Sequence, residues 1–263
     1  MKYILIITLL LFINSCKNPL SKNNTENTPA DYAIQNTENG EILLRLKPKV
    51  GDKTNLKMEV NMQPEGMMIS LDTHFVGDLK LRVTDTNEVE NTYSVDFQRI
   101  QFNTALLGTK ISYDSQGKNE NIPKPLQDEL EKVLAKKIVM TLDSLAHVNS
   151  ISFDQNQDDM ASQSIDLNAL FIPLPVKPVK VGDQWNAHQY VQNMGDKELT
   201  YTIDKISNTE VLVLLSSSGD EVKGQYLIDR KTGFTKQGTL NIHSVENGKG
   251  LTMELQLTSS PAL

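Results

Sequence analysis

The side chains that could carry chemistry are scattered along this sequence rather than grouped. Its four histidines, His74, His147, His188 and His243, lie far apart, and none has a His-x-Glu or His-Glu-x-x-His context. A zinc site needs clustered ligands, so we expect these imidazoles to have surface or structural roles. The chain also lacks a Gly-x-Ser-x-Gly nucleophile motif and a phosphate-binding glycine loop. The sequence therefore predicts a protein that is not an enzyme and holds no metal or other cofactor.

One acidic stretch partly matches a calcium-binding loop. Asp154, Asn156 and Asp158 have the spacing of loop positions one, three and five. Position six should be glycine and is Asp159, and position twelve should be glutamate and is Ile165. Because both of these positions fail, a solvated acidic loop is the better interpretation.

The single cysteine, Cys16, follows directly on an apolar run near the N-terminus. The run from Tyr3 to Ile13 is 11 residues long, whereas a membrane-spanning helix needs about 20. Its length fits the apolar region of a secretion signal. Ile13-Asn14-Ser15-Cys16 resembles the lipobox of bacterial lipoproteins, with an aliphatic residue at minus three and a small one at minus one. We expect residues 1–15 to be removed and Cys16 to carry covalent lipid. The alternative is an ordinary secretion signal with an incidental cysteine.

The residues after Cys16 bear on location. Residues 16–39 are rich in Asn, Thr, Ser, Glu and Pro and show no hydrophobic period, which predicts a disordered tether. Lys17 occupies the second mature position and resembles the outer-membrane sorting class, and no acidic surface-export tag follows it. We therefore expect a lipid-anchored envelope protein, facing the periplasm from the outer membrane. The net charge of -7 argues against a nucleic-acid partner.

Hydrophobic residues alternate through most of the remaining chain. Met58 and Met62 belong to one such stretch, in which apolar residues alternate with Lys, Glu and Asn. This period of two predicts antiparallel strands with one solvated face. Only residues near 125–136 follow a helical period instead. We predict a mainly β fold with a first β-rich half at 40–160, a second at 161–263, and one short amphipathic helix.

A sequence repeat suggests that the halves arose by internal duplication. Lys47-Pro48-Lys49-Val50-Gly51-Asp52 corresponds to residues 177–183, and each copy precedes an alternating strand. We expect a tight turn in both copies, with glycine at positive φ. Residues 113–117 and 228–233 form a second correspondence. Chance recurrence of common β-turn sequences is the alternative.

The chain resembles a family of uncharacterised, β-rich Bacteroidota lipoproteins. The residues that carry this resemblance are Leu46-Lys47-Pro48 with Gly51-Asp52, Ile111 to Ser115, Pro175-Val176, and Val181 to Trp185. The resemblance covers most of residues 40–260 and implies a periplasmic, lipid-anchored β protein. It implies no activity.

An apolar, proline-interrupted segment is the best candidate for ligand contact. Pro173 and Pro175 prevent this segment from joining a central strand. Methionines recur at adaptable hydrophobic sites, and Met67 and Met68 add to those of the first strands. The candidate contacts are Met58, Met62, Leu170, Phe171, Ile172, Leu174 and Trp185. The segment would then act as a flap over an apolar ligand. The alternative is a crossover that covers the core, with Trp185 as a core anchor.

The sequence leaves two functional hypotheses. The first is a non-enzymatic binding or scaffolding protein of the cell envelope with a protein partner. The second is a carrier of lipid or other hydrophobic ligands. An apolar cavity beneath residues 170–176 would favour the carrier, and a solid core there would favour the scaffold.

Overall fold

The computed structural model describes residues 40–65, 72–106, 109–153, 167–191, 195–219, 221–246 and 249–262 of the 263 residues. Cys16, the predicted signal and tether, Met67, Met68 and the acidic stretch at 154–159 lie outside this part. The elements in chain order are β1 (Lys53–Glu65), β2 (Thr73–Thr86), β3 (Glu90–Leu106), β4 (Thr109–Asp114), α2 (Lys124–Ala135), β5 (Lys137–Asp143), β6 (Val148–Phe153), η1 (Asn168–Leu170), β7 (Gln184–Val191), β8 (Gly195–Ile206), β9 (Glu210–Ser217), β10 (Val222–Asp229), β11 (Thr235–Glu246) and β12 (Lys249–Pro261).

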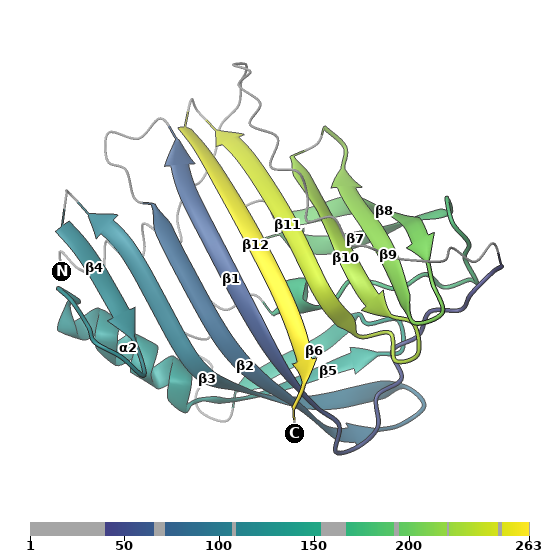
Figure 1. Cartoon of the computed structure of the whole chain (residues 1–263), viewed down its shortest axis with the longest axis horizontal. Helices are drawn as coiled ribbons and strands as arrows, with labels where there is room; N and C mark the ends of the chain where they lie inside the picture. Colours follow the sequence, from purple (N-terminus) through teal and green to yellow (C-terminus); the bar gives the residue numbers. More distant parts are fainter. Residues whose placement is uncertain are drawn as a thin grey trace.

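The described strands form one 12-stranded antiparallel sheet (Figure 1). Its order is β6-β5-β3-β2-β1-β12-β11-β10-β9-β8-β7, and β4 pairs with the second part of β3. β12 pairs with β1 from Thr54↔Pro261 to Glu65↔Gly250, so the last strand joins the two β-rich ranges. The predicted mainly β, antiparallel fold is confirmed, and both ranges contribute to the same sheet.

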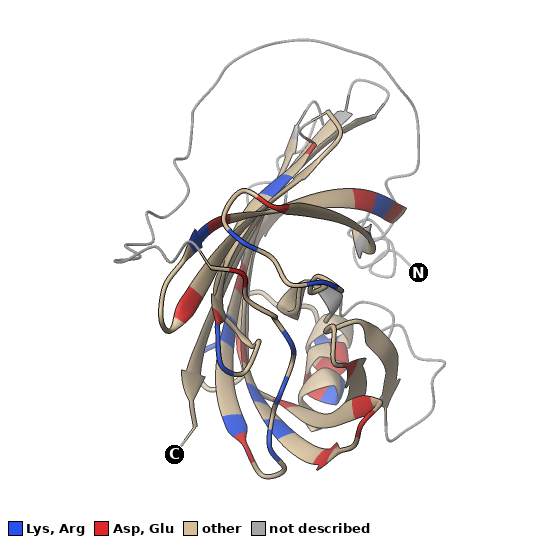
Figure 2. Ribbon diagram, turned by 90° about the vertical axis from the view of Figure 1, so that its right-hand side faces the viewer, with Lys and Arg blue, Asp and Glu red and all other residues tan. Residues whose placement is uncertain are grey.

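The sheet bends into a trough with an apolar inner face. β5 and β6 at one edge and β7 and β8 at the other turn back behind the central strands, and α2 lies inside the bend (Figures 1 and 2). Alternate residues of each strand point inward and are buried, as Leu56 and Leu79 are where they oppose each other on β1 and β2. The buried apolar residues form one cluster that includes Val133 of α2. Each such fully buried side chain contributes about 1.5–3 kcal/mol.

The single predicted helix is confirmed within one residue of its predicted bounds. Helix α2 begins after Pro123, whose carbonyl accepts the first helical hydrogen bonds, and Pro125 fits the first turn, where an N–H is not needed. Its apolar side packs on β3 and buries Val133. Lys124 and Asp128 form an ion pair of 2.7 Å on its outer side.

The two Val-Gly-Asp turns have the same geometry. Gly51 and Gly182 have φ angles of 91° and 89°. The N–H of Gly51 donates to the carbonyl of Val83 at 2.9 Å, and that of Gly182 donates to the carbonyl of Ile203 at 2.8 Å. In each copy the following aspartate also accepts a bond from the lysine N–H three residues before it. Each turn is therefore a glycine bulge that leads into a strand. The positive φ of both glycines confirms the prediction from the sequence.

Further matches between the two ranges lie in the hairpins. β1, β2, β3, β5 and β6 will be called the first set, and β7 to β11 the second set. β3 pairs with β5 at Glu90↔Asp143, and β9 pairs with β10 at Glu210↔Asp229. Asp229 therefore corresponds to Asp143 and not, as the sequence comparison suggested, to Asp114. Duplication of the sets stays a prediction; β4 and α2 form an insertion in the first set, and β12 follows the second.

Candidate ligand-binding site

The inner face of the sheet is less completely covered at one end of β1. Val60, Met62 and Phe75 are only partly buried there, although they pack against the core. Val60 and Met62 lie two residues apart on β1 and so point to the same face, and Phe75 opposes Val60 on β2. These three side chains therefore lie side by side, and Met253 on β12 opposes Met62. Met58, nearer the start of β1, is buried. Val60, Met62 and Phe75, here called the inner apolar patch, offer hydrophobic surface to a ligand.

The predicted flap is part of the hydrophobic core. Leu170, Phe171, Ile172 and Leu174 are each at most 2% exposed. Phe171 lies 5.9 Å from the ring of Tyr93 on β3 and 5.3 Å from the ring of Phe234 beside β11. The segment thus packs between the two sets of strands. This arrangement agrees with a crossover that covers the core, and a role of these residues in ligand contact stays a prediction.

Several hydrogen bonds hold this crossover in place. The N–H of Leu174 donates to the carbonyl of Leu145 at 2.7 Å, and Ile42 pairs with Val179. The guanidinium of Arg45 donates to the carbonyls of Pro175 and Val176 at 2.8 and 2.6 Å. These bonds satisfy backbone groups of a segment whose prolines keep it out of the sheet.

Trp185, which the sequence places among the candidate contacts, faces the crossover from β7. Its ring stacks on Tyr201 at a centroid distance of 5.3 Å. Its Nε1 donates to the carbonyl of Pro173 at 3.0 Å. Burial raises the pKa of the Tyr201 hydroxyl, which donates to Gln189 at 2.7 Å. Trp185 is therefore fixed at both its ring and its polar atom, and it is only partly buried.

A groove of about 400 Å³ lies between the crossover and β7. Trp185 and Leu174 are the only predicted contact residues that line it, and Leu170, Phe171 and Ile172 lie in the core beside it. The groove, called the β7 groove below, is lined by His147, Pro173 to Val179, and Asp183 to Ala187. The β7 groove thus lies beside the second part of residues 170–176.

The titratable groups of the described residues show no catalytic arrangement. Tyr93 is 1% exposed and its hydroxyl has no hydrogen-bond partner. Burial, with a smaller contribution from Asp52, raises the pKa of Tyr93, so this phenol stays protonated. His147 contacts Asp143 at 2.9 Å, and His188 contacts Asp196 at 3.2 Å.

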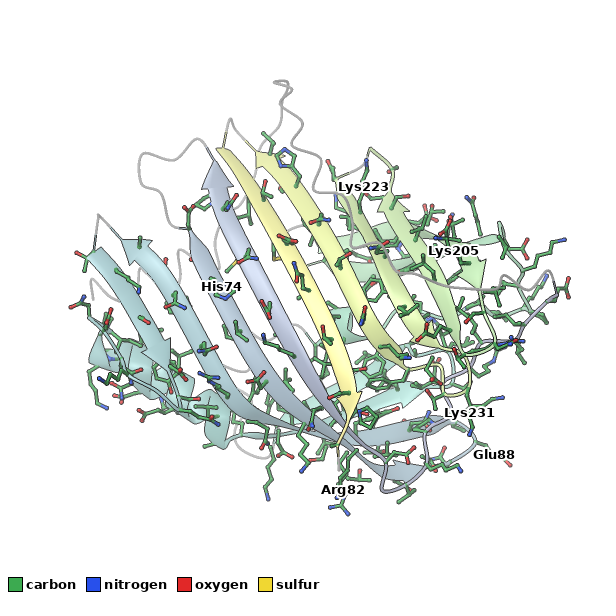
Figure 3. The ribbon with its side chains drawn as sticks, in the orientation of Figure 1. His74, Arg82, Glu88, Lys205, Lys223 and Lys231 are labelled. Carbon is green, nitrogen blue, oxygen red and sulfur yellow. The ribbon has the colours of Figure 1, made fainter. Side chains whose placement is uncertain are left out.

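His74 bonds Asn61 at 2.7 Å on the outer face of the sheet (Figure 3). Within the described ranges, no group of three or more His, Cys, Asp or Glu side chains could hold a metal ion.

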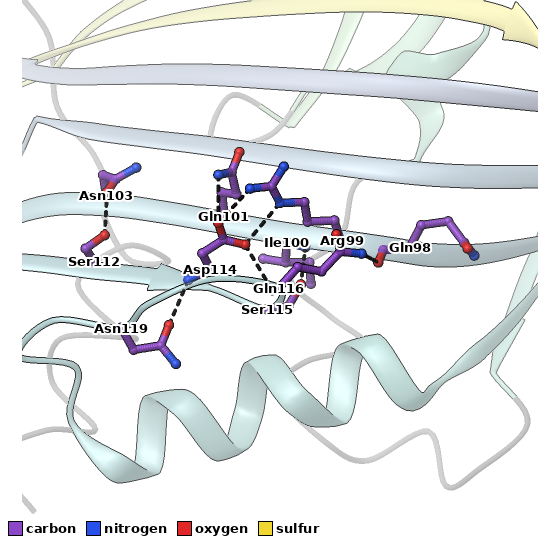
Figure 4. A network of polar contacts seen from close by, with 10 residues as sticks. All are labelled: Gln98, Arg99, Ile100, Gln101, Asn103, Ser112, Asp114, Ser115, Gln116 and Asn119. Carbon is purple, nitrogen blue, oxygen red and sulfur yellow. Dashed lines mark hydrogen bonds and ion pairs between the residues drawn. The ribbon is translucent and has the colours of Figure 1, made fainter.

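The outer face of the sheet carries polar networks. One such network surrounds Asp114 at the end of β4 (Figure 4). Arg99 donates from Nε to Oδ1 at 3.0 Å and from Nη2 to Oδ2 at 2.6 Å, and Gln101 donates to Oδ2 at 3.1 Å. The Arg99 bonds lower the pKa of the Asp114 carboxyl. This network ties the β4 insertion to β3 and contributes nothing to the groove.

Sequence reasoning missed Arg45 and the β7 groove. Arg45 gave no signal because its partners are backbone carbonyls 130 residues away in sequence. The groove depends on which strand forms a sheet edge, which alternation of hydrophobic residues does not encode. None of the described helices is both long and apolar enough to cross a membrane.

A bent antiparallel sheet with a helix and a crossover on its apolar inner face defines the fold class. No family model matches the chain, and no curated protein matches its sequence. A solved structure of lipovitellin that concerns lipid–protein interactions superposes with a TM-score of 0.53 at 7% identity, over 82% of this chain and 26% of lipovitellin. The chain spans about a quarter of lipovitellin, and the likeness concerns the fold alone.

Two bacterial structures superpose less well. A DUF1329 family protein from Desulfovibrio piger gives a TM-score of 0.23 at 8% identity, over 81% of this chain and 88% of its own. An outer membrane lipoprotein-sorting protein domain from Vibrio parahaemolyticus gives 0.20 at 10% identity, over 81% and 87%. These scores are too low to support a common fold.

Proposed function

We propose that the protein is a non-enzymatic carrier of lipid or another hydrophobic ligand in the bacterial cell envelope, anchored through lipid on Cys16. The observation that carries the proposal is the inner apolar patch on a deeply bent sheet. Lipovitellin, whose structure was described for its lipid–protein interactions, supports the proposal through its similar fold.

The patch has the properties that an acyl chain would need. Val60, Met62 and Phe75 are neighbours on adjacent strands, and their side chains keep apolar surface that the core does not cover. Each methylene that a ligand buries there contributes about 0.8 kcal/mol. Methionine adapts to chains of different shape, so Met62 would let the patch select for hydrophobic character more than for a particular lipid.

Native mass spectrometry of the purified full chain tests the proposal. We expect non-covalent lipid to remain bound and to be released by organic extraction, whereas lipid on Cys16 would stay attached. The matched variants are Met62→Glu, which places a charge in the patch, and Val89→Glu, at a valine that is already 73% exposed in a turn. Met62→Glu should lose the non-covalent lipid and Val89→Glu should keep it. Equal occupancy in both variants would contradict a site at the patch.

The membrane anchor requires a separate test. We expect the chain to incorporate labelled palmitate and the Cys16→Ser variant not to do so. A Cys16→Ser protein that still incorporates the label would exclude lipidation at this residue.

A scaffolding role is the second candidate function. It is favoured by the burial of residues 170–172 in the hydrophobic core, where a flap over a ligand would keep exposed apolar surface. A bare mass after gentle purification, together with no uptake of fatty acid from vesicles, would support the scaffold over the carrier.

A further inference from the structure

The β7 groove follows the edge of a strand. In the described residues β7 pairs only with β8. Four consecutive β7 residues, Gln184 to Ala187, line the groove. Alternate residues of a strand point to opposite faces, so a space lined by consecutive residues lies along the strand's edge. The groove therefore exposes backbone as well as side chains.

Hydrogen-bonded and non-hydrogen-bonded pairs alternate along β7 and β8, and this alternation identifies the exposed backbone groups of β7. The N–H of Ile203 donates to the carbonyl of Asp183 at 3.0 Å. Hydrogen-bonded pairs in an antiparallel ladder recur every second residue, so Trp185 and Ala187 bond β8. The N–H and C=O groups of Gln184 and Asn186 consequently point away from the sheet, toward the groove. The facing crossover cannot pair with them as a strand, because Pro173, Pro175 and Pro178 lack N–H groups.

The first set shows what covers the equivalent edge. β1 begins after the Gly51 bulge as β7 begins after the Gly182 bulge, so Lys53 corresponds to Gln184 and Asn55 to Asn186. The edge of β1 is covered by β12: the N–H of Ala262 donates to the carbonyl of Lys53 at 3.1 Å, and Asn55 opposes Ser260. An extended antiparallel strand thus occupies the position that beside β7 is a groove.

The wall of the groove that His147 forms also has an equivalent, the chain around Phe234 beside β12. β12 is held on its far side by β11, where Ser259 Oγ donates to the carbonyl of Thr235 at 2.8 Å. Phe234, just before Thr235, accepts the hairpin bond from the N–H of Asp229 at 2.9 Å. In the first set His147 accepts the corresponding bond from Asp143 at 3.0 Å, and His147 lines the groove. The β7 groove therefore corresponds to the space that β12 residues 258–262 fill.

We propose that the β7 groove binds one extended peptide strand of a partner protein, antiparallel to β7 and hydrogen-bonded to Gln184 and Asn186. Such strand addition takes its affinity from backbone hydrogen bonds and its specificity from alternate side chains. A small apolar residue would lie opposite Trp185, where β12 places Pro261 opposite Thr54. A second copy fits less well, because its own crossover lies along its β7.

The chain supplies a probe and a reporter for this site. The probe is a synthetic peptide of residues 253–262, MELQLTSSPA, which already covers the equivalent edge of β1. Trp185 is the only tryptophan in the chain and lines the groove. We expect the peptide to change Trp185 fluorescence in a saturable manner and to slow hydrogen exchange at the N–H of Asn186. Absence of both effects would overturn the proposal.

Two further measurements separate strand addition from other binding. Asn186→Pro removes an edge N–H and the side-chain bonds of Asn186 to Glu198 and Thr200, but no backbone bond to β8, and it should weaken peptide binding about tenfold or more. Asn186→Ala loses the same side-chain bonds, keeps the N–H and should still bind the peptide. Independently of any variant's folding, peptides N-methylated at the alternate amides that face β7 should fail to bind, and peptides methylated at the other amides should bind. Equal binding of both peptides would overturn the proposal. So would a dimer of the full chain that Asn186→Pro converts to a monomer, since the occupant would then be a second copy.

Discussion

β1 and β7 begin in the same way but have different neighbours. Both follow a Val-Gly-Asp bulge with φ near 90°, and both pair with the next strand in the chain. β1 is then covered on its other side by β12, whereas β7 borders a groove. Local sequence thus determines the turn and the pairing with the next strand. Whether the other edge of β1 is covered depends on β12, some 200 residues further along the chain. The two edges provide matched positions at which this difference can be measured.

Truncation of Phe171 should have the largest effect, because this residue contacts both sets. Its ring packs against Tyr93 of the first set and Phe234 beside the second. Phe171→Ala should lower the free energy of unfolding by about 3–5 kcal/mol. Urea unfolding followed by circular dichroism and by Trp185 fluorescence would measure it.

The control for this truncation is Phe171→Leu, which keeps most of the apolar volume and should cost less than Phe171→Ala. A loss below about 1 kcal/mol in Phe171→Ala would mean that the crossover is not a core element. The flap hypothesis would then regain support.

Proline at the two equivalent asparagines should give unequal effects. Asn55→Pro removes an N–H that faces β12, and we expect a loss of about 2–3 kcal/mol in the free energy of unfolding. Asn186→Pro removes the corresponding N–H at the edge that borders the groove, together with the exposed side-chain bonds of Asn186 to Glu198 and Thr200. The loss should stay below that of Asn55→Pro by about 1 kcal/mol. Urea unfolding of both variants measures the contrast. Equal losses would show that the β7 edge is covered in solution.

Alanine at the two bulge glycines should instead give equal effects. Gly51 and Gly182 share a positive φ, and no atom lies within 4 Å of an added Cβ at either position. The cost is therefore that of the left-handed backbone alone, about 1–2 kcal/mol for each variant. A difference of more than about 0.5 kcal/mol between the two would contradict the structural equivalence of the turns.

The sequence predicted what local patterns encode. Alternation of apolar residues indicated the strands, the period near 125–136 indicated α2, and the glycines of the Val-Gly-Asp turns were expected at positive φ. These features depend on neighbouring residues. Trp185 and Leu174 line the β7 groove, and their contact with a ligand stays a prediction.

Features that depend on distant contacts were not predictable in this way. The sequence comparison matched Asp229 with Asp114, but the sheet register matches it with Asp143, because β4 and α2 interrupt the first set. The burial of Phe171 depends on aromatic partners 78 and 63 residues away, which no local pattern reveals. Among the described strands β7 pairs only with β8, and this likewise follows from the whole strand order and not from the composition of β7.

The insertion in the first set gives the smallest expected effect, and this effect depends on pH. Asp114 of β4 accepts two bonds from Arg99, and these bonds lower the pKa of its carboxyl in the folded state. A lowered folded-state pKa stabilises the protein above the ordinary aspartate pKa of about 3.9, and this stabilisation is lost as pH falls below that value. Asp114→Asn should therefore lower the melting temperature by about 1–3 °C at pH 7 and make stability less dependent on pH between about 5 and 2.

The matched control is Asp229→Asn in the second set. All three side-chain bonds of Asp229 come from Lys231 and Thr232 to Oδ1, and an asparagine oxygen can accept the same bonds. Asp229→Asn should therefore keep these bonds and lower the melting temperature at pH 7 by less than Asp114→Asn does. If thermal melts across this pH range show the two variants to be alike, the Arg99 pair does not stabilise the fold. The β4 insertion would then be held by its backbone pairing with β3 and by α2 alone.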